Sequence, residues 1–247
     1  MLDDLKYLFA YTIPLSTLLA IFSEGIFTFA TPIYAFIFIP FLEIIMKDYD
    51  TKYDEDQKKK RLSNRIFDIL LYLNIPFVFI LLFFGLNKLT DNSLIIIEKV
   101  GIVSSLGILL ATNAINVAHE LGHRISRTER TLSKILLIPC LYMHFYLEHN
   151  FGHHKNVATP EDPATSKFNQ SVYHFWITSV FNQFVNAWKI QKEILKRSEK
   201  SFISFQNDMI WYMIIQSAYL YLIFMFFGIY GLFYAVIVGI QSFLFLE

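Results

Sequence analysis

The sequence has almost no cysteine and no net charge. Cys140 is the only cysteine, so no disulfide can form within the chain. Lys and Arg total 21, as do Asp and Glu, which leaves no electrostatic case for nucleic-acid binding. Met1 is followed by Asp3 and Asp4 instead of a basic segment, so we expect no cleaved signal peptide. The apolar run around Cys140 predicts that this thiol is inert packing.

Apolar residues are abundant and gathered in blocks. The chain is 55% hydrophobic and 17% aromatic, with a mean hydropathy of +0.43, which is high for a soluble domain of 247 residues. Long runs of Leu, Ile and Phe alternate with short charged stretches, as in polytopic α-helical membrane proteins. We therefore predict an all-α integral membrane protein with about six transmembrane helices: Tyr7–Phe22, Ile26–Met46, Ile66–Leu86, Leu94–Ala118, Asp208–Phe227 and Ile229–Leu246.

Basic residues predict how these spans are oriented. Seven Lys and Arg lie in the loop 47–65 and eleven in 119–207, against one in the loop 87–93. Because Lys and Arg concentrate in cytoplasmic loops, we expect both basic segments and both termini to face the cytoplasm. The segment 169–201 is predicted to form an amphipathic helix. It would lie on the membrane surface or on the protein's own cytosolic part.

The stretch VAHELGHRIS holds a possible metal-binding pair. His119 and His123 are four residues apart, so on a helix both imidazoles can reach one ion. The pattern H-E-x-x-H is the helix motif of zinc proteases. Intramembrane zinc proteases of the site-2 type add an Asp ligand from an Asp-Gly context, and this sequence contains no Asp-Gly dipeptide.

A second cluster, EHNFGHH, follows about thirty residues later. It contains His149, His153 and His154, with the first two again four residues apart and His154 turned aside on an ideal helix. Five clustered histidines are too many for one tetrahedral zinc and suit two iron ions. Glu120 and Glu148 each adjoin a ligand histidine, and we predict that they accept the distal N–H of the ligand rings.

Together, HELGH, EHNFGHH and VATPEDPATS resemble the alkane 1-monooxygenase family, which belongs to the fatty-acid-desaturase-like histidine-box enzymes. The most specific part of the resemblance runs without a gap from Glu148 to Ala164, with Phe151 where these enzymes often have a basic residue. The resemblance covers the chain from end to end and implies one desaturase-like domain over 1–247. It also implies six helices in a bacterial cytoplasmic membrane and a cytoplasm-facing di-iron centre.

The resemblance also implies an activity and its residues. Terminal hydroxylation of medium- or long-chain n-alkanes to 1-alkanols would use O2 and electrons from rubredoxin and its reductase. His119 and His123 match the family's first histidine box, and His149, His153 and His154 match its second.

Two histidines and two motifs depart from this match. His144 stands where the family often has a histidine outside the boxes, and we expect a supporting role for it; His174 matches nothing. A later N-Y-x-E-H-Y-G segment and a third H-x-x-H-H box are absent. Five imidazoles are too few to fill two iron shells, so we expect the missing motifs beyond Glu247, in a longer reading frame.

Three alternatives to this function remain. A related membrane desaturase or hydroxylase acting on fatty acyl or aromatic methyl substrates would share the boxes. A membrane H-E-x-x-H zinc protease would use fewer ligands than the sequence offers. A non-catalytic membrane protein would need none. Metal analysis of the full-length protein would distinguish these classes: two iron ions indicate a di-iron enzyme, one zinc ion a protease, and no metal a non-catalytic protein.

Overall fold

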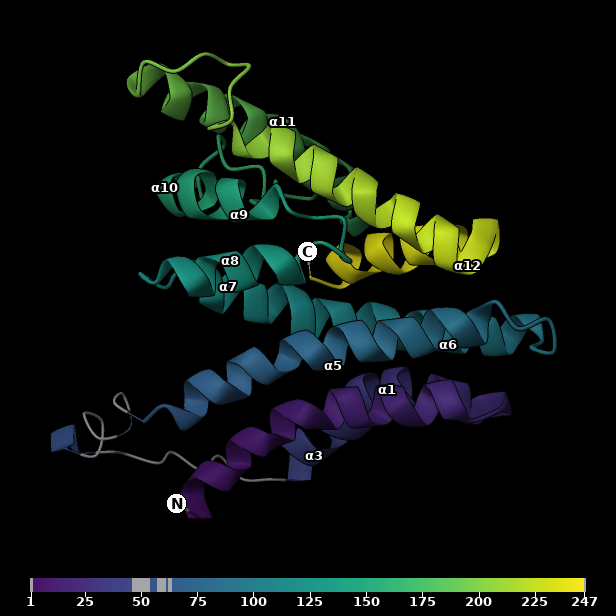
Figure 1. Cartoon of the computed structure of the whole chain (residues 1–247). Coiled ribbons are helices and arrows are strands. Elements are labelled where there is room, and N and C mark those ends of the chain that lie inside the picture. Colours follow the sequence, from purple (N-terminus) through teal and green to yellow (C-terminus); the bar gives the residue numbers. More distant parts are fainter. Residues whose placement is uncertain (1, 46–53, 57–60, 62–63, 247) are drawn as a thin grey trace.

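The fold is known from a computed structural model, which describes residues 2–45, 54–56, 61 and 64–246; within them all regular structure is helical (Figure 1). Most of the predicted basic loop 47–65 lies outside the described residues. The helices are η1 Leu2–Tyr11, α1 Thr12–Phe22, η2 Gly25–Phe29, α2 Ala30–Ile33, η3 Tyr34–Phe38, α3 Ile39–Ile45, α5 Ile66–Leu89, α6 Ile96–Leu109, η4 Leu110–Ile115, α7 Asn116–Gly122, α8 Arg127–Leu136, α9 Phe145–Glu148, η5 His149–His153, α10 His154–Asn156, α11 Val172–Arg197 and α12 Asp208–Leu246.

The predicted all-α membrane architecture is confirmed. Among the described residues, four helices are long and apolar enough to cross a bilayer: Gly25–Ile45, Ile66–Leu89, Ile96–Gly122 and Asp208–Leu246. The first predicted span corresponds to a shorter apolar helix, Lys6–Phe22. Met46, predicted as the end of the second span, lies outside the described residues.

Helix α12 accounts for the last two predicted spans. Its 39 residues would extend about 58 Å if straight, roughly twice the hydrocarbon thickness of a bilayer. Gly228 interrupts it with φ 67° and ψ −166°, a left-handed conformation that glycine adopts without steric cost. Figure 1 shows the result as two arms, the second returning toward the middle of the molecule. Each arm therefore has the length of one crossing.

Three turns meet at one end of the bundle, called the outer end below. The Glu98 carboxylate accepts hydrogen bonds from the backbone N–H of Gly25 at 2.7 Å and of Ile95 at 3.1 Å. It thereby satisfies the free N–H groups at the start of two helices, η2 and α6. Near Gly228, a Cβ at Gly231 would lie 3.6 Å from the Thr90 methyl carbon. The connections after α1, α5 and the first arm of α12 thus share this end.

Close packing of η2 against α6 depends on Gly101. A Cβ at this position would lie 2.2 Å from Thr28 Oγ1 and 2.8 Å from a ring carbon of Phe29. Small residues of this kind let membrane helices approach closely. The Ser105 hydroxyl adds a hydrogen bond of 3.0 Å to the Thr28 carbonyl.

Gly101→Val should therefore lower the free energy of unfolding by about 1–3 kcal/mol, as overpacking of a tight interior does. The measurement is the thermal unfolding midpoint in detergent. Val100→Ile is the matched control, because Val100 is 47% exposed on the outside of the same helix. Equal midpoints for Gly101→Val and the control would contradict the close contact.

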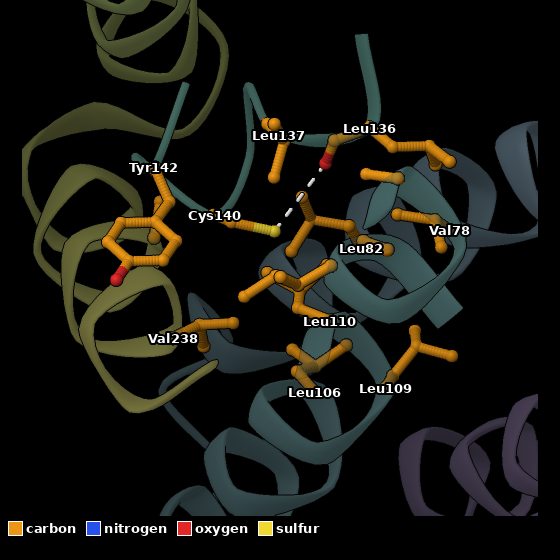
Figure 2. Close-up of a cluster of buried hydrophobic side chains, with 14 of the residues drawn as sticks. Val78, Leu82, Leu106, Leu109, Leu110, Leu136, Leu137, Cys140, Tyr142 and Val238 are labelled. Atoms are coloured by element: carbon orange, nitrogen blue, oxygen red, sulfur yellow. Dashed lines mark hydrogen bonds between the residues drawn. The ribbon is translucent and has the colours of Figure 1, made fainter. Parts of the chain in front are cut away.

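The segment between α8 and α9 penetrates the bundle. Leu136, Leu137, Cys140 and Tyr142 are fully buried, and Figure 2 shows them against leucines of α6 and η4 and Val238 of α12. Non-helical backbone at such a depth is tolerated where protein surrounds it. The Cys140 thiol lies 3.5 Å from the Leu136 carbonyl, and burial raises its pKa. The prediction that Cys140 is inert packing agrees with this environment.

Helix α11 is amphipathic, as predicted, but its apolar face points outward in its first half. Its fully buried side chains are mostly small or polar: Ser179, Gln183, Ala187, Gln191 and Leu195. Phe184, Trp188 and Ile194 are partly buried against the core beside them. Tyr173, Ile177 and Phe181 are 65–72% exposed. The polar stripe contacts α9 and the segments before α9 and α12. Tyr142 Oη, before α9, donates to Gln183 Oε1 at 2.8 Å, and Gln191 Nε2 donates to the Gln206 carbonyl, before α12, at 3.1 Å. The helix therefore packs on the protein and still presents an apolar face outward.

Candidate metal centre

The first pair of histidines lies at the inner end of the span Ile96–Gly122, opposite the outer end. His119 is in the last turn of α7 and His123 follows it directly as the helix ends. The preceding turn, η4, is a π-helix, a local widening that frequently occurs at functional sites. The Ser133 hydroxyl donates to the Ala118 carbonyl at 2.6 Å and so braces α8 against α7.

The second group of histidines lies on another π-helical turn, η5. The backbone N–H of His154 donates to the carbonyl of His149, five residues earlier, whereas an α-helix would bond residues four apart. The wider turn brings His154 to the face of His149. The structure differs here from the expectation that His153 shares that face and His154 points aside, because that expectation assumed α-helical spacing.

Four of the five predicted ligand histidines come together. His119, His123, His149 and His154 each offer a ring nitrogen, and these nitrogens all lie within 4.8 Å of one another. The Nε2 atoms of His119 and His123 are 3.1 Å apart, those of His123 and His154 3.3 Å, and those of His154 and His149 3.0 Å. We call this set the four-histidine group.

The three Nε2 separations of 3.0–3.3 Å fit neighbouring ligands on one metal ion. Imidazole nitrogens about 2.1 Å from an ion are roughly 3.0–3.4 Å from their neighbours in octahedral or tetrahedral coordination. Imidazole ligands suit iron, zinc, copper and nickel. Burial, followed by the neighbouring imidazoles, lowers the pKa of His149 to about 3, so its ring is in the neutral, metal-binding form near pH 7. Burial and neighbouring imidazoles lower the pKa of His154 as well.

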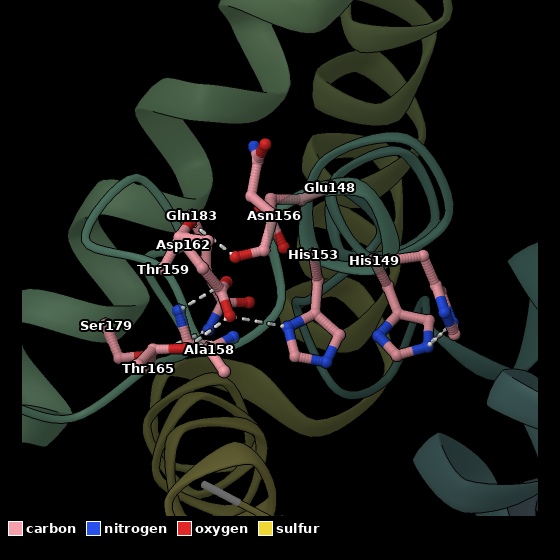
Figure 3. Close-up of polar contacts among 12 residues, drawn as sticks. Glu148, His149, His153, Asn156, Ala158, Thr159, Asp162, Thr165, Ser179 and Gln183 are labelled. Atoms are coloured by element: carbon pink, nitrogen blue, oxygen red, sulfur yellow. Dashed lines mark hydrogen bonds and ion pairs between the residues drawn. The ribbon is translucent and has the colours of Figure 1, made fainter.

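His153 is held outside the four-histidine group by Asp162. Its Nδ1 lies 3.0 Å from Asp162 Oδ2, and the Asp162 side chain is fully buried (Figure 3). The carboxylate also accepts from the Thr165 hydroxyl at 2.6 Å and from the Ala164 backbone N–H at 3.0 Å. A carboxylate bound to one ring nitrogen fixes a histidine for metal binding through the other. Asp162 lies within the specific run 148–164, but no spacing rule in the sequence identifies it as a partner of a histidine.

Asp162→Ala should therefore loosen the segment 156–166. The substitution removes a buried acceptor from His153, Thr165 and the Ala164 N–H, at a cost of about 1–3 kcal/mol for the groups left unpaired. Limited proteolysis and amide hydrogen exchange would report this as faster cleavage and lost protection in 156–166. Glu161→Ala is the control, because Glu161 is the exposed neighbouring carboxylate. Unchanged protection in Asp162→Ala would contradict the role of this carboxylate.

The two predicted supporting carboxylates differ in environment. Glu120 is half exposed, and its Oε1 lies 2.9 Å from Arg124 Nη2 in an ion pair along the helix. Glu148 is only 1% exposed and its Oε1 accepts from Asn186 Nδ2 of α11 at 3.1 Å. Glu148 thus joins the turn that carries His149 to α11, a partner that the sequence analysis did not identify. Binding of a ligand ring by either carboxylate remains a prediction.

The two remaining histidines lie outside the group. His144 is buried between the rings of Tyr142 and Phe184, with ring centroids 4.7 and 5.2 Å away, and burial lowers its pKa to about 3. His174 is exposed in the first turn of α11, where its backbone N–H is capped by the Ser171 hydroxyl at 3.3 Å.

Comparisons with known proteins bear on this site. The fatty acid desaturase family model matches residues 99–246, which include the four-histidine group. Alkane 1-monooxygenase 2 of Alcanivorax borkumensis is 35% identical over 182 residues, covering 72% of this chain and 48% of that protein. Alkane 1-monooxygenase of Pseudomonas putida is 33% identical, covering 77% and 47%.

A third relative has another substrate in its name. The xylene/toluene monooxygenase hydroxylase component XylM of Pseudomonas putida is 27% identical over 150 residues, covering 60% of this chain and 41% of that protein. The chain spans about half the length of the curated alkane 1-monooxygenases described above.

Proposed function

The chain belongs to the fatty acid desaturase family, and from this premise we propose that it acts as an alkane 1-monooxygenase in a bacterial cytoplasmic membrane. The observation that carries the proposal is the four-histidine group, which lies within the matched region at the inner end of an apolar bundle. Similarity to several alkane 1-monooxygenases supports an alkane as the substrate.

The proposed cofactor is a pair of non-haem iron ions. The four-histidine group would hold one ion through its imidazole nitrogens. His153, whose Nδ1 is occupied by Asp162, would present its other nitrogen to the second ion. The second ion needs further donors beyond these five histidines. When bound, the metal supplies O2 activation, and the protein supplies ligands and a water-poor surrounding.

A zinc protease fits this arrangement poorly. Four imidazoles complete a tetrahedral zinc shell and leave no position for the water that a protease activates. Glu120, which would serve as the general base, is paired with Arg124 instead. We keep as a proposal that Glu120 and Glu148 accept the distal N–H of ligand rings, and the Glu148 contact with Asn186 would in addition hold the second histidine turn against α11.

The proposed reaction requires an electron donor and a membrane substrate. Conversion of R–H and O2 to R–OH and water consumes two electrons and two protons. We propose that rubredoxin, reduced by its reductase, delivers the electrons from the cytoplasm. The hydrocarbon would reach the metal along the apolar helices, because alkanes partition into the bilayer.

The proposed orientation is testable with fusion reporters. A periplasm-dependent reporter should be active after Asp91, in the loop at the outer end, and silent after Lys58, which lies outside the described residues in the basic loop. The reason is the excess of Lys and Arg in 47–65 and 119–207. The reverse pattern would place the histidines on the periplasmic side and contradict delivery of electrons by a cytoplasmic donor.

The activity can be tested in membranes of cells that produce the protein. With n-octane, O2 and reduced rubredoxin, 1-octanol should form, and His119→Ala should abolish it. Formation of olefinic acyl chains, or of benzylic alcohols from xylene, would support the related desaturase or arene-methyl hydroxylase instead. Peptide cleavage without oxidation would support the protease. Octanol formation that persists in His119→Ala would contradict the proposed centre.

A further inference from the structure

The solvent-exposed side of the second histidine turn, η5, carries one exposed aromatic ring surrounded by cations. We infer that this surface, comprising Phe151, Arg127, Arg130, Lys155 and Arg197 and called the Phe151 surface below, is where a small acidic electron-carrier protein docks. The inference rests on the proposed function, because an O2-reducing monooxygenase centre needs electrons from a carrier. It adds the residues through which the carrier is recognised.

The shape of the Phe151 surface suits a protein partner. Two adjoining hollows, of about 400 and 410 Å³, share Phe151 and Ile194 as their common wall. Phe151 is 50% exposed although it is a large apolar residue in a polar region. A protruding aromatic residue flanked by concave surface is typical of an interface hot spot, because it is desolvated when the partner covers it.

The charges around Phe151 favour an acidic partner. The residues lining the two hollows include five cations and only two carboxylates, Asp208 and Glu193. Asp208 is paired with Lys134 at 3.1 Å, and Glu193 lies 3.9 Å from Arg197 in a pair that is largely exposed. The surface is therefore positive overall. Such a field attracts a partner of opposite charge and speeds its association.

The position of Phe151 suits electron delivery. Phe151 lies in η5, midway between His149 and His153. Residues two apart in a helix have Cα atoms about 5.5 Å from each other, so the Phe151 backbone lies less than one helical turn from the backbone of each of these histidines. A carrier seated on Phe151 would be separated from the metal ligands by this single turn. The exposed apolar residues Tyr173, Ile177 and Phe181 lie in the first half of α11, whereas Ile194 and Arg197 of the Phe151 surface lie in its last turns.

Binding measurements on the whole protein in detergent can test this inference, with reduced rubredoxin as the probe. Arg127→Glu combined with Arg197→Glu should weaken binding about tenfold or more at low salt and flatten its salt dependence. Phe151→Ala should weaken binding several-fold with little change in salt dependence. Lys192→Glu is the matched control, since Lys192 is exposed on α11 outside both hollows. Circular dichroism and metal content would verify that each variant is folded and loaded.

The outcomes separate this inference from the proposed function. Selective loss of rubredoxin binding in the Phe151-surface variants supports the docking surface, even if the protein hydroxylates no alkane, in which case only the proposed function fails. Absence of binding by the wild type, or equal loss in Lys192→Glu, would overturn the docking surface. It would also be overturned if the variants lost binding only to vesicles of anionic lipid, because the cations would then serve the membrane.

Discussion

His149→Ala should abolish retention of metal by the purified protein. His149 is a half-buried member of the four-histidine group, with its Nε2 3.0 Å from that of His154 and its ring centroid 4.4 Å from that of His119. Removing it leaves three imidazoles around a methyl group, and even the loss of a residue that merely supports a ligand commonly lowers metal affinity about 10–100-fold. We expect a loss of at least about 100-fold, measured by anaerobic Fe(II) titration and by metal analysis after desalting.

The control for this prediction is His174→Ala. His174 is exposed on α11, and its side chain belongs to no histidine cluster among the described residues. The cap at the start of α11 uses its backbone N–H and survives the substitution. Metal content should therefore stay at the wild-type level. Equal losses in His149→Ala and His174→Ala would remove the basis for assigning the four-histidine group.

Hydropathy and charge were sufficient to predict the membrane helices. The helices Ile66–Leu89 and Ile96–Gly122 begin and end within a few residues of their predicted bounds. The reason is that a bilayer fixes both the length and the composition of a spanning helix. The break between the last two spans was also predictable, because Gly228 separates two apolar runs of similar length within α12.

Helix α11 shows where such patterns become ambiguous. Apolar residues at helical spacing predicted an amphipathic helix, but periodicity alone does not say which stripe faces the protein. The structure buries the stripe of Ser179, Gln183 and Ala187 and exposes Tyr173 and Ile177. Hydrogen bonds such as Tyr142 to Gln183 determine this choice, and their partners are distant in sequence.

The candidate site was predictable in its residue types and only partly in its geometry. Two histidine pairs predicted a metal centre on the side of the basic segments, and four of these five histidines converge. The anchoring of His153 by Asp162 was missed, although a carboxylate that follows a histidine box is a reasonable partner for one of its rings. The π-helical turn η5 was missed because no rule of spacing distinguishes it from an α-helix in a single sequence.

The π-helical turn predicts that His154→Ala and His153→Ala differ strongly in metal affinity. If His154 belongs to the four-histidine group and His153 does not, their alanine variants should behave differently toward the first metal ion. His154 Nε2 is 3.0 Å from that of His149 and 3.3 Å from that of His123, so His154→Ala should weaken the tightest site by at least about 100-fold. His153→Ala leaves all four imidazoles of the group in place, so the affinity for the first ion should fall by less than about tenfold.

Anaerobic titration with Co(II), followed by its visible absorption, would measure the two variants, because the bands report the coordination number and geometry of the bound ion. His153→Ala should retain the wild-type spectrum for the first equivalent and lose any second equivalent, since its free ring nitrogen is the donor proposed for the second ion. His154→Ala should lose the spectrum of the first equivalent. The opposite pattern, with a tight first site in His154→Ala and none in His153→Ala, would mean that the turn is α-helical when metal is bound. The two histidines would then exchange roles. In an α-helix the residue four positions after His149, which is His153, shares its face, whereas in a π-helix the residue five positions later, His154, does so.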